Sequence, residues 1–284
     1  MKLDGRRMSD NVDDRRGNKS TGKISLGIGG TVILALIVWA LGGNPLSVVT
    51  QQATDNIPTD QNYTPTAEEE AAAQFSKKIL AGTEDVWTEI FKENGMTYTP
   101  PKMVLFSGAT RSGCGNASSS TGPFYCPADQ TLYIDLSFFD QMQTQLNAGG
   151  DFAYAYVIAH EVGHHVQYLL GTLDKVHQQQ RQVSEKESNQ LNVRIELQAD
   201  FYAGVWAYHD NQDFGSIEEG DIEEGLNAAT QIGDDRLQME AQGYTVPDAF
   251  NHGTSDQRSR WLKKGLQTGN IKDGDTFSIP YSSL

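Results

Sequence analysis

The sequence predicts an α+β protein, mainly helical with a small sheet, preceded by one transmembrane helix. Three features carry this prediction: an uncharged apolar run near the N-terminus, two short alternating segments typical of strands, and long segments with apolar residues at helical spacing. The strand-like segments precede most of the helical ones instead of alternating with them, which favours α+β over α/β. With 284 residues, the chain is long enough to bury a sizeable core.

The apolar run extends from Ile24 to Leu41, and its 18 uncharged residues are just enough to cross a bilayer as a helix. Seven basic and four acidic residues lie between the N-terminus and Lys23, whereas no Lys or Arg follows the run until Lys77. The positive-inside rule then predicts a cytoplasmic N-terminus and a periplasmic or extracellular location for the rest of the chain. An uncleaved anchor is favoured over a cleaved signal peptide, because no clear A-x-A site follows the run.

We therefore expect a cytoplasmic tail at 1–23, a plasma (inner) membrane anchor at 24–42, a polar linker at 43–65 and a folded domain at 66–284. After the tail, 15 basic residues stand against 33 acidic ones, and the formal net charge of the chain is −15. A body this acidic repels phosphate backbones, so nucleic acid is not expected as a partner. A charged, water-facing surface explains most of the acidity, which identifies no substrate.

The folded domain is expected to begin with a helix near Thr66, where Thr66 and Glu69 form a capping box and apolar residues recur at helical spacing. Two short strands are expected at 104–107 and 131–136. Three further helices are expected at 151–170, 184–208 and 216–232, with N-caps at Asp151, Ser184 and Ser216. The Gln-rich segment 177–188 is expected to be a mobile surface linker between the first two of these helices.

Cys114 and Cys126 lie between the two predicted strands and bracket a Gly/Ser-rich segment. In an oxidising compartment, a disulfide between them would stabilise the fold by about 3 kcal/mol in the chain-entropy model. The alternatives are a pair of free buried thiols or a second metal site, which is weakly supported because no histidine lies nearby.

The central motif is His160-Glu161-Val162-Gly163-His164, within the predicted helix at 151–170. Histidines at i and i+4 project from one helix face and can bind a single zinc ion, while Glu161 can reach a water in the open coordination position and act as general base. Two histidines on a solvated helix edge are the alternative. Gly163 costs up to about 1 kcal/mol inside a helix, which we interpret as allowing another backbone to approach the site.

A second motif, Glu196-Leu197-Gln198-Ala199-Asp200, places two carboxylates at i and i+4 on the next predicted helix. A catalytic zinc site needs a third protein ligand and a partner that orients a zinc-bound histidine. Glu196 is the candidate ligand, and Asp200 is the candidate acceptor of a hydrogen bond from a histidine. A solvent-exposed acidic face is the alternative, but apolar residues surround the pair on nearly every side, and an unpaired carboxylate among them would be costly.

Five separated segments together resemble the bacterial neutral zinc metallopeptidase family: GRRMSDNVDDRRG, GPFYCPADQTLYIDLSFF, HEVGHHVQ, ELQADFYAGVWA and FNHGTSDQRSRWLKKG. The resemblance covers nearly the whole chain. It implies a zincin-like fold of the gluzincin type, in which the first motif supplies two histidine ligands and the base, and Glu196 is the third ligand. Where the family often has a cysteine after the aspartate of the second motif, this chain has Phe201, which leaves every proposed ligand in place.

Two other histidines could have a role at the predicted site. His165 points about 100° away from His164 on the predicted helix, so we expect it at the surface or beside a ligand. His252 follows Asn251 in a Gly/Thr-containing segment. Zincins commonly place a downstream His or Tyr where it stabilises the oxyanion, so His252 is a candidate catalytic residue, with structural hydrogen bonding as the rival interpretation.

Together these features predict a membrane-anchored peptidase that binds one zinc per chain and hydrolyses protein or peptide substrates with Glu161 as the base. A different zinc hydrolase, for example an amidase that acts on cell-wall peptides, is one alternative. A binding or chaperone-like membrane protein that keeps a zinc-stabilised site is another, although Glu161 argues against it, because a structural zinc needs no base and prefers four protein ligands.

Overall fold

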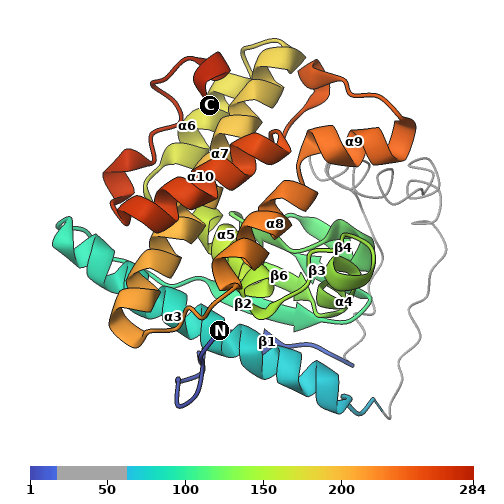
Figure 1. Ribbon diagram of the computed structural model, residues 1–284, viewed down its shortest axis with the longest axis vertical. Helices are drawn as coiled ribbons and strands as arrows, with labels where there is room; N and C mark the ends of the chain where they lie inside the picture. The colour runs from blue at the N-terminus through green and yellow to red at the C-terminus, as the bar shows by residue number, and fades with distance from the viewer. Residues whose placement is uncertain (18–62) are drawn as a thin grey trace.

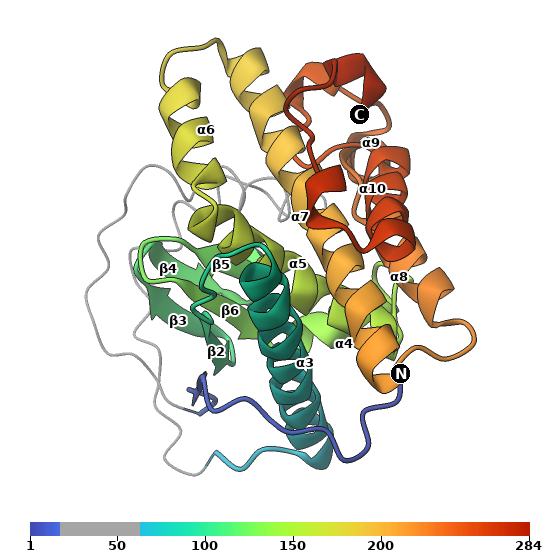
Figure 2. The same cartoon turned by 90° about the vertical axis from the view of Figure 1, so that its left-hand side faces the viewer.

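The computed structural model describes residues 1–17 and 63–284. Within these residues a small sheet packs beside a group of helices, of which α3, α5 and α7 contact one another (Figures 1 and 2). The fold is therefore mainly helical with a small sheet, as the sequence predicts. The expected anchor at 24–42 and most of the linker lie outside the described residues, and none of the described helices is long and apolar enough to cross a membrane.

Helix α3 (Ala67–Glu93) begins where the capping box places it. The Thr66 hydroxyl accepts a hydrogen bond from the Glu69 backbone N–H, and the Glu69 carboxylate accepts one from the Thr66 N–H. The helix then buries its apolar face, which includes Trp87 and Phe91, in the main core. Both the capping box and the apolar spacing are confirmed.

The larger sheet has four strands in the order β1-β2-β6-β5. Strands β1 (Val12–Asp14), β2 (Lys102–Phe106) and β6 (Thr131–Asp135) run parallel, whereas β5 (Phe124–Cys126) is antiparallel to β6 and forms an edge of the sheet. The two predicted strands correspond to β2 and β6. A separate antiparallel pair follows β2 and consists of β3 (Ala109–Ser112) and β4 (Gly115–Ser118).

A disulfide joins Cys114 to Cys126, so the predicted disulfide is confirmed, and neither free thiols nor a second metal site involve these cysteines. Cys114 lies at the turn between β3 and β4, and Cys126 ends β5. The bond therefore ties the hairpin to the edge of the larger sheet.

Seven helices follow the sheet in the described part of the chain (Figure 1). Their bounds are α4 (Ser137–Thr144), α5 (Asp151–Leu169), α6 (Thr172–Gln180), α7 (Glu185–Phe214), α8 (Asp221–Gln231), α9 (Asp234–Gln242) and α10 (Ser255–Thr268). Single turns of 3-10 helix lie at Ser119–Thr121, Pro247–Ala249, Ile271–Asp273 and Tyr281–Ser283.

The structure differs from the predicted helices at three places. Gly150, with φ 130°, is the N-cap of α5, and Asp151 is the first helical residue. The segment expected to be a mobile linker contains the end of α6. Helix α8 begins at Asp221, not near Ser216, because the Ser216 carbonyl accepts a hydrogen bond from the Lys2 backbone N–H and is held outside the helix. Of these three helices, only α7 starts at its predicted N-cap, where Ser184 and Glu187 form a capping box.

The first 17 residues pack against the rest of the fold. Strand β1 pairs with β2, and Arg6 forms two hydrogen bonds with Asp210 at the end of α7. Arg7 pairs with Asp85 of α3. This arrangement differs from the separate tail expected at 1–23, because the basic residues that suggested a cytoplasmic tail bind acidic residues of the domain.

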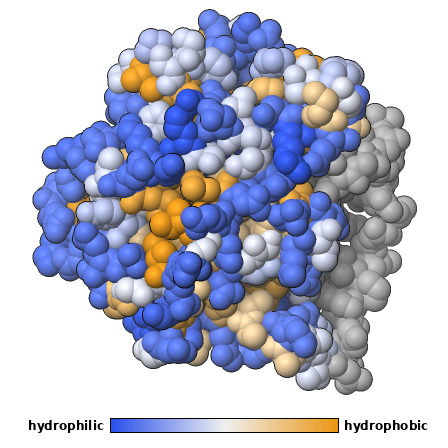
Figure 3. All heavy atoms as spheres, viewed as in Figure 1, coloured by the Kyte–Doolittle hydropathy of each residue, from blue (hydrophilic) through white to orange (hydrophobic). Residues whose placement is uncertain are grey.

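Figure 3 shows one face of the molecule, on which hydrophilic residues predominate around smaller apolar areas. A predominantly polar surface agrees with the excess of acidic over basic residues.

Candidate metal centre

Two neighbouring helices carry the two predicted motifs. His160, Glu161 and His164 lie on α5, and Glu196 lies on α7, which packs against α5. The close approach occurs at Gly163, where a Cβ atom would lie 3.0 Å from the Ala199 carbonyl oxygen and 3.1 Å from its Cα. The interpretation of Gly163 as a site of close backbone approach is confirmed.

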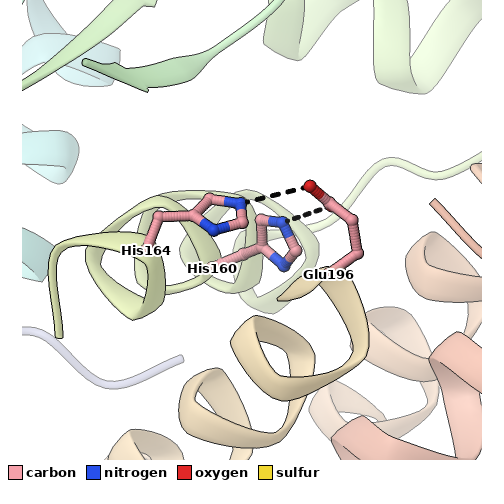
Figure 4. Close-up of side chains that lie close together, drawn as sticks. All are labelled: His160, His164 and Glu196. Atoms are coloured by element: carbon pink, nitrogen blue, oxygen red, sulfur yellow. Dashed lines mark hydrogen bonds and ion pairs between the residues drawn. The ribbon is translucent and has the colours of Figure 1, made fainter. Parts of the chain in front are cut away.

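Three side chains converge between these helices (Figure 4). His160 Nε2 lies 3.1 Å from Glu196 Oε2, and His164 Nε2 lies 3.4 Å from Glu196 Oε1. One ligand atom from each residue lies within 4.8 Å of the others. Two imidazoles and one carboxylate are a common ligand set of catalytic zinc sites, so the donor chemistry fits zinc.

The other ring nitrogen of each histidine forms a hydrogen bond that fixes the ring. His160 Nδ1 donates to Asp200 Oδ1 at 2.8 Å, and His164 Nδ1 donates to Gln167 Oε1 at 2.9 Å. The Gln167 amide is itself fixed, because its Nε2 donates to the Ile195 carbonyl at 2.7 Å. With Nδ1 acting as donor in both rings, the Nε2 atoms face Glu196, and each can bind a cation once it carries no hydrogen.

Asp200 links three helices beneath the site. Its side chain is fully buried and also accepts hydrogen bonds from the Tyr156 hydroxyl at 2.6 Å and from the Arg258 guanidinium at 2.9 Å. Burial alone would raise the pKa of Asp200, but the charges of Arg258 and His160 outweigh it and lower the pKa to about 2. Asp200 is therefore a carboxylate that can orient His160 over the whole physiological pH range.

The electrostatic field at the ligand atoms favours a cation. Burial opposes protonation of His160, but Asp200 and Glu196 outweigh burial and raise its pKa to about 10. The pKa of His164 is raised by Glu196 against the same opposition. Burial would raise the pKa of Glu196, yet the two histidines hold it well below its ordinary value. A site that stabilises positive charge in this way suits a proton or a metal ion.

His252 lies on the same cleft as Glu161 and the three converging side chains. Its Nδ1 donates to Asp234 Oδ1 at 3.0 Å, while Asp234 Oδ2 accepts from the backbone N–H groups of residues 251–253. Burial opposes protonation of His252, but Asp234 outweighs it and raises the pKa of the imidazole. Asp234 thus orients the His252 ring through Nδ1, and the Nε2 atom can interact with another partner.

His165 has a different place from the one expected. It is fully buried, so the expectation of a surface position is wrong. Its Nε2 donates to the Thr99 carbonyl at 2.7 Å, and its Nδ1 therefore accepts from the Tyr125 hydroxyl at 2.9 Å. Burial lowers the pKa of His165 to about 4, which keeps the ring neutral. His165 joins α5 to β5 and takes no part in the converging cluster.

Sequence reasoning did not identify four side chains around the site: Tyr156, Gln167, Asp234 and Arg258. Tyr156 and Gln167 lie one turn away from the two motif histidines along α5, so helical spacing offered a signal for them. Asp234 and Arg258 come from distant parts of the chain and give no such local signal. Arg258 lies inside the segment FNHGTSDQRSRWLKKG, whose resemblance to the family assigns no role to this arginine.

The converging residues open into a cleft of about 230 Å³. Its walls come from β5, α4, α5, α7, α9, α10 and the segment between β4 and β5, and the side chains that line it are both apolar and polar. They include Thr121, Phe124, Phe138, Gln141, Leu146, Val157, His160, Glu161, His164, Glu196, Ile232, Leu237, His252 and Arg258.

Comparison with known proteins agrees with these features. A family described as "Putative neutral zinc metallopeptidase" matches residues 1–277. "Uncharacterized protein YpfJ" of Escherichia coli (strain K12) is 49% identical over 286 residues, which is 98% of this chain and 99% of the relative. "Uncharacterized protein Rv2575" of Mycobacterium tuberculosis (strain H37Rv) is 39% identical over 251 residues, 84% of each chain. No solved structure matches significantly. The chain therefore belongs to the neutral zinc metallopeptidase family.

Proposed function

We propose that this protein is a zinc-dependent peptidase in which His160, His164 and Glu196 hold the metal and Glu161 is the general base. The convergence of these three side chains at one end of an open cleft, with Glu161 on the same lining, is the observation that carries the proposal. Three protein ligands are typical of catalytic zinc sites, whereas structural sites usually have four.

A bound zinc ion would act as a Lewis acid, polarising the peptide carbonyl and lowering the pKa of the attacking water. Glu161 then takes a proton from that water and delivers it to the leaving amine. Glu161 suits this role because it adjoins a ligand on the same helix and lines the cleft. Asp200 and Gln167 hold the two imidazoles while the proton moves.

His252 supplies a hydrogen-bond donor for the carbonyl oxygen as that oxygen gains negative charge. Asp234 supports this role in two ways, because it fixes the ring through Nδ1 and favours the protonated form that also carries a hydrogen at Nε2. The hydrogen bond to Asp234 fits a purely structural role for His252 equally well. Kinetic measurements therefore have to distinguish the catalytic role from the structural one.

The edge strand supports a polypeptide as the substrate class. Strand β5 forms an edge of the four-stranded sheet, and Phe124 and Tyr125 of this strand line the cleft. An extended peptide can add to such an edge through main-chain hydrogen bonds. A small amide would leave this edge unused.

The location of the domain outside the cytoplasm is a further proposal. It is supported by the disulfide between Cys114 and Cys126, since such bonds persist in oxidising compartments.

The proposal is tested with the purified full-length chain, by zinc analysis and by turnover of an unfolded protein with and without chelator. Glu161→Gln should retain one zinc per chain and lower turnover by about 10²–10⁴-fold, because only the proton transfer is lost. His160→Ala and His164→Ala should lose both zinc and activity.

Glu89 is an exposed carboxylate on α3, and Glu89→Gln is the matched control, which should change neither zinc content nor turnover. Near-normal turnover by Glu161→Gln would refute the assigned mechanism, and absence of zinc in the folded protein would refute the enzyme.

A further inference from the structure

The cleft at the candidate metal site has an apolar surface built from several elements. Phe138 at the start of α4 and Leu146 just after that helix form one part of it. Val157 of α5 forms another, and Ile232 and Leu237, at the end of α8 and on α9, form the opposite part. Side chains so distant in the sequence converge on one surface, which is therefore a feature of the folded cleft and not of one amphipathic helix.

This surface is available to a ligand and adjoins the proposed chemistry. Val157 precedes Glu161 by one helical turn on α5, so the apolar area begins beside the proposed base. Phe138, Leu146 and Leu237 are only partly buried, unlike the core residues behind them. A substrate side chain that covers them would remove apolar surface from water, and one methylene in such a pocket changes kcat/KM by about 10- to 200-fold.

The charged groups in the cleft are already engaged. Arg258 is paired with Asp200, and His252 is paired with Asp234. Among the described residues that line the cleft, the remaining carboxylate and imidazole side chains are Glu161 and the proposed zinc ligands His160, His164 and Glu196. Outside these pairs and the metal cluster, the lining therefore offers no basic side chain that could bind the C-terminal carboxylate of a peptide. The remaining carboxylate, Glu161, is needed as the base and so cannot bind the N-terminal amine.

We propose that the cleft accepts internal peptide bonds next to a large apolar side chain, which rests on the proposed peptidase function. Peptides blocked at both ends provide the test, with Leu, Phe, Ala, Asp or Lys at each position around one bond. The Leu and Phe peptides should be cleaved with kcat/KM at least about tenfold above the Ala peptide and further above the charged ones. Removing the blocking groups should not be required for cleavage.

Leu237→Lys tests the wall directly. The added cation should lower kcat/KM for the Leu peptide at least about tenfold and improve cleavage of the Asp peptide relative to it. Met239→Lys is the matched control: Met239 lies on the same helix, is half exposed and does not line the cleft, so its variant should keep the parent preference. Binding of the same blocked peptides to the zinc-loaded Glu161→Gln protein gives a second measurement that does not depend on turnover, and Leu237→Lys should change it in the same direction.

The outcomes separate the two proposals. If the zinc-loaded protein cleaves neither peptides nor unfolded protein, the peptidase function itself fails. If it cleaves them but removes only terminal residues, shows no preference for apolar side chains, or keeps its preference in Leu237→Lys, the function stands and the inference about the cleft is overturned.

Discussion

Asp200 accepts four hydrogen bonds, from Tyr156, from His160 and twice from Arg258, although its side chain is fully buried. A buried carboxylate is tolerated only where it is paired and hydrogen-bonded, and Arg258 supplies the charge that compensates it. Because Arg258 also lies 3.9 Å from Glu196, its cation adjoins two of the carboxylates around the candidate site. The orientation of His160 thus depends on a side chain from α10, far from both motifs in the sequence.

The His252–Asp234 pair leads to a pH dependence. Since Asp234 raises the pKa of His252 above its ordinary value, the imidazolium and its Nε2 hydrogen are present below the raised pKa and are lost as pH rises through it. With Nδ1 donating to Asp234, the neutral ring offers only a lone pair at Nε2. We expect kcat to fall by about 10²–10³ across this titration if His252 is the oxyanion donor. Asp234→Asn should move the fall to lower pH.

The measurement is the pH profile of kcat for the parent protein, Asp234→Asn and Asp248→Asn, the last an exposed control in the same part of the chain. Zinc content and melting temperature are followed in parallel. A structural role for His252 makes a different prediction, in which His252→Ala melts lower while kcat per folded molecule and its pH profile stay normal. That result would remove His252 from the mechanism and leave the metal cluster unaffected.

The individual site residues that could be predicted are those whose spacing in the sequence matches the turn of an α-helix. The i and i+4 spacing puts His160 and His164 on one face of α5, and Glu196 and Asp200 on one face of α7. The packing of α5 against α7 then brings Glu196 to the two histidines. Arg258 and Asp234 could not be predicted in this way, because their partners lie on other elements and only tertiary packing brings them close.

At the scale of elements, the segment closed by the disulfide forms one rim of the cleft. Cys114 and Cys126 bracket β4, a single 3-10 turn and β5, and Thr121, Pro123 and Phe124 from this segment line the cleft. The covalent bond holds this segment together with the pairing of β4 with β3 and of β5 with β6. Chain-entropy arguments give about 3 kcal/mol for a loop of this size.

Reduction of this disulfide should therefore impair catalysis more than metal binding. Cys114→Ser/Cys126→Ser should keep one zinc per chain, because none of the three converging side chains belongs to the segment, and should melt several degrees lower. We expect KM for peptides to rise, since the rim that holds the substrate is less ordered. Zinc analysis, thermal melting and steady-state kinetics check these points. Unchanged KM in the double variant would show that the rim does not contact substrate, and loss of zinc would show a wider role in the fold.

Element boundaries were predictable where capping chemistry is local and failed where it is not. The boxes at Thr66 and Ser184 start α3 and α7 because the hydroxyl and carboxylate satisfy N–H groups within the same turn. The similar pattern at Ser216 starts no helix, since its backbone pairs with the N-terminal segment instead. Strand β1 could not be predicted either, because its three residues gain their stability only by pairing with β2.

At the scale of the whole molecule, the N-terminal segment is part of the domain. Arg6 and Asp210 form a bidentate pair in which the aspartate is almost fully buried, and Ser9 and Asn11 both donate to the buried Glu84. Removing a partner from such a buried pair typically costs about 3–5 kcal/mol. Residues 1–17 therefore contribute to the stability of the fold, and a stable molecule is expected to keep them docked.

This docking bears on the topology. A single crossing by residues 24–42 would place residues 1–17 and 63–284 on opposite sides of a membrane, and the two parts could not then pack together. We expect the packing to hold, and hence both parts to lie on one side. Lys2→Cys and Asp256→Cys test this, because both side chains are largely exposed, at 67% and 82%. A membrane-impermeant maleimide applied to intact cells and then to lysed cells should label both positions, or neither, at each stage.

A double-mutant cycle on Arg6→Ala and Asp210→Ala measures the docking independently of the membrane. If the segment is docked, each single variant should unfold with a free energy lowered by about 3–5 kcal/mol, and the double variant should lose far less than the sum, because the two residues act as one pair. Additive effects, together with labelling of Lys2→Cys and Asp256→Cys from opposite sides, would contradict the docking and favour the single crossing that the charge distribution predicts. If both cysteines are labelled from the same side and the effects of Arg6→Ala and Asp210→Ala are far from additive, the basic residues of the N-terminal segment stabilise the fold. The positive-inside rule would then fail for this chain, because its basic residues are engaged by Asp85 and Asp210 and no longer mark the cytoplasmic face.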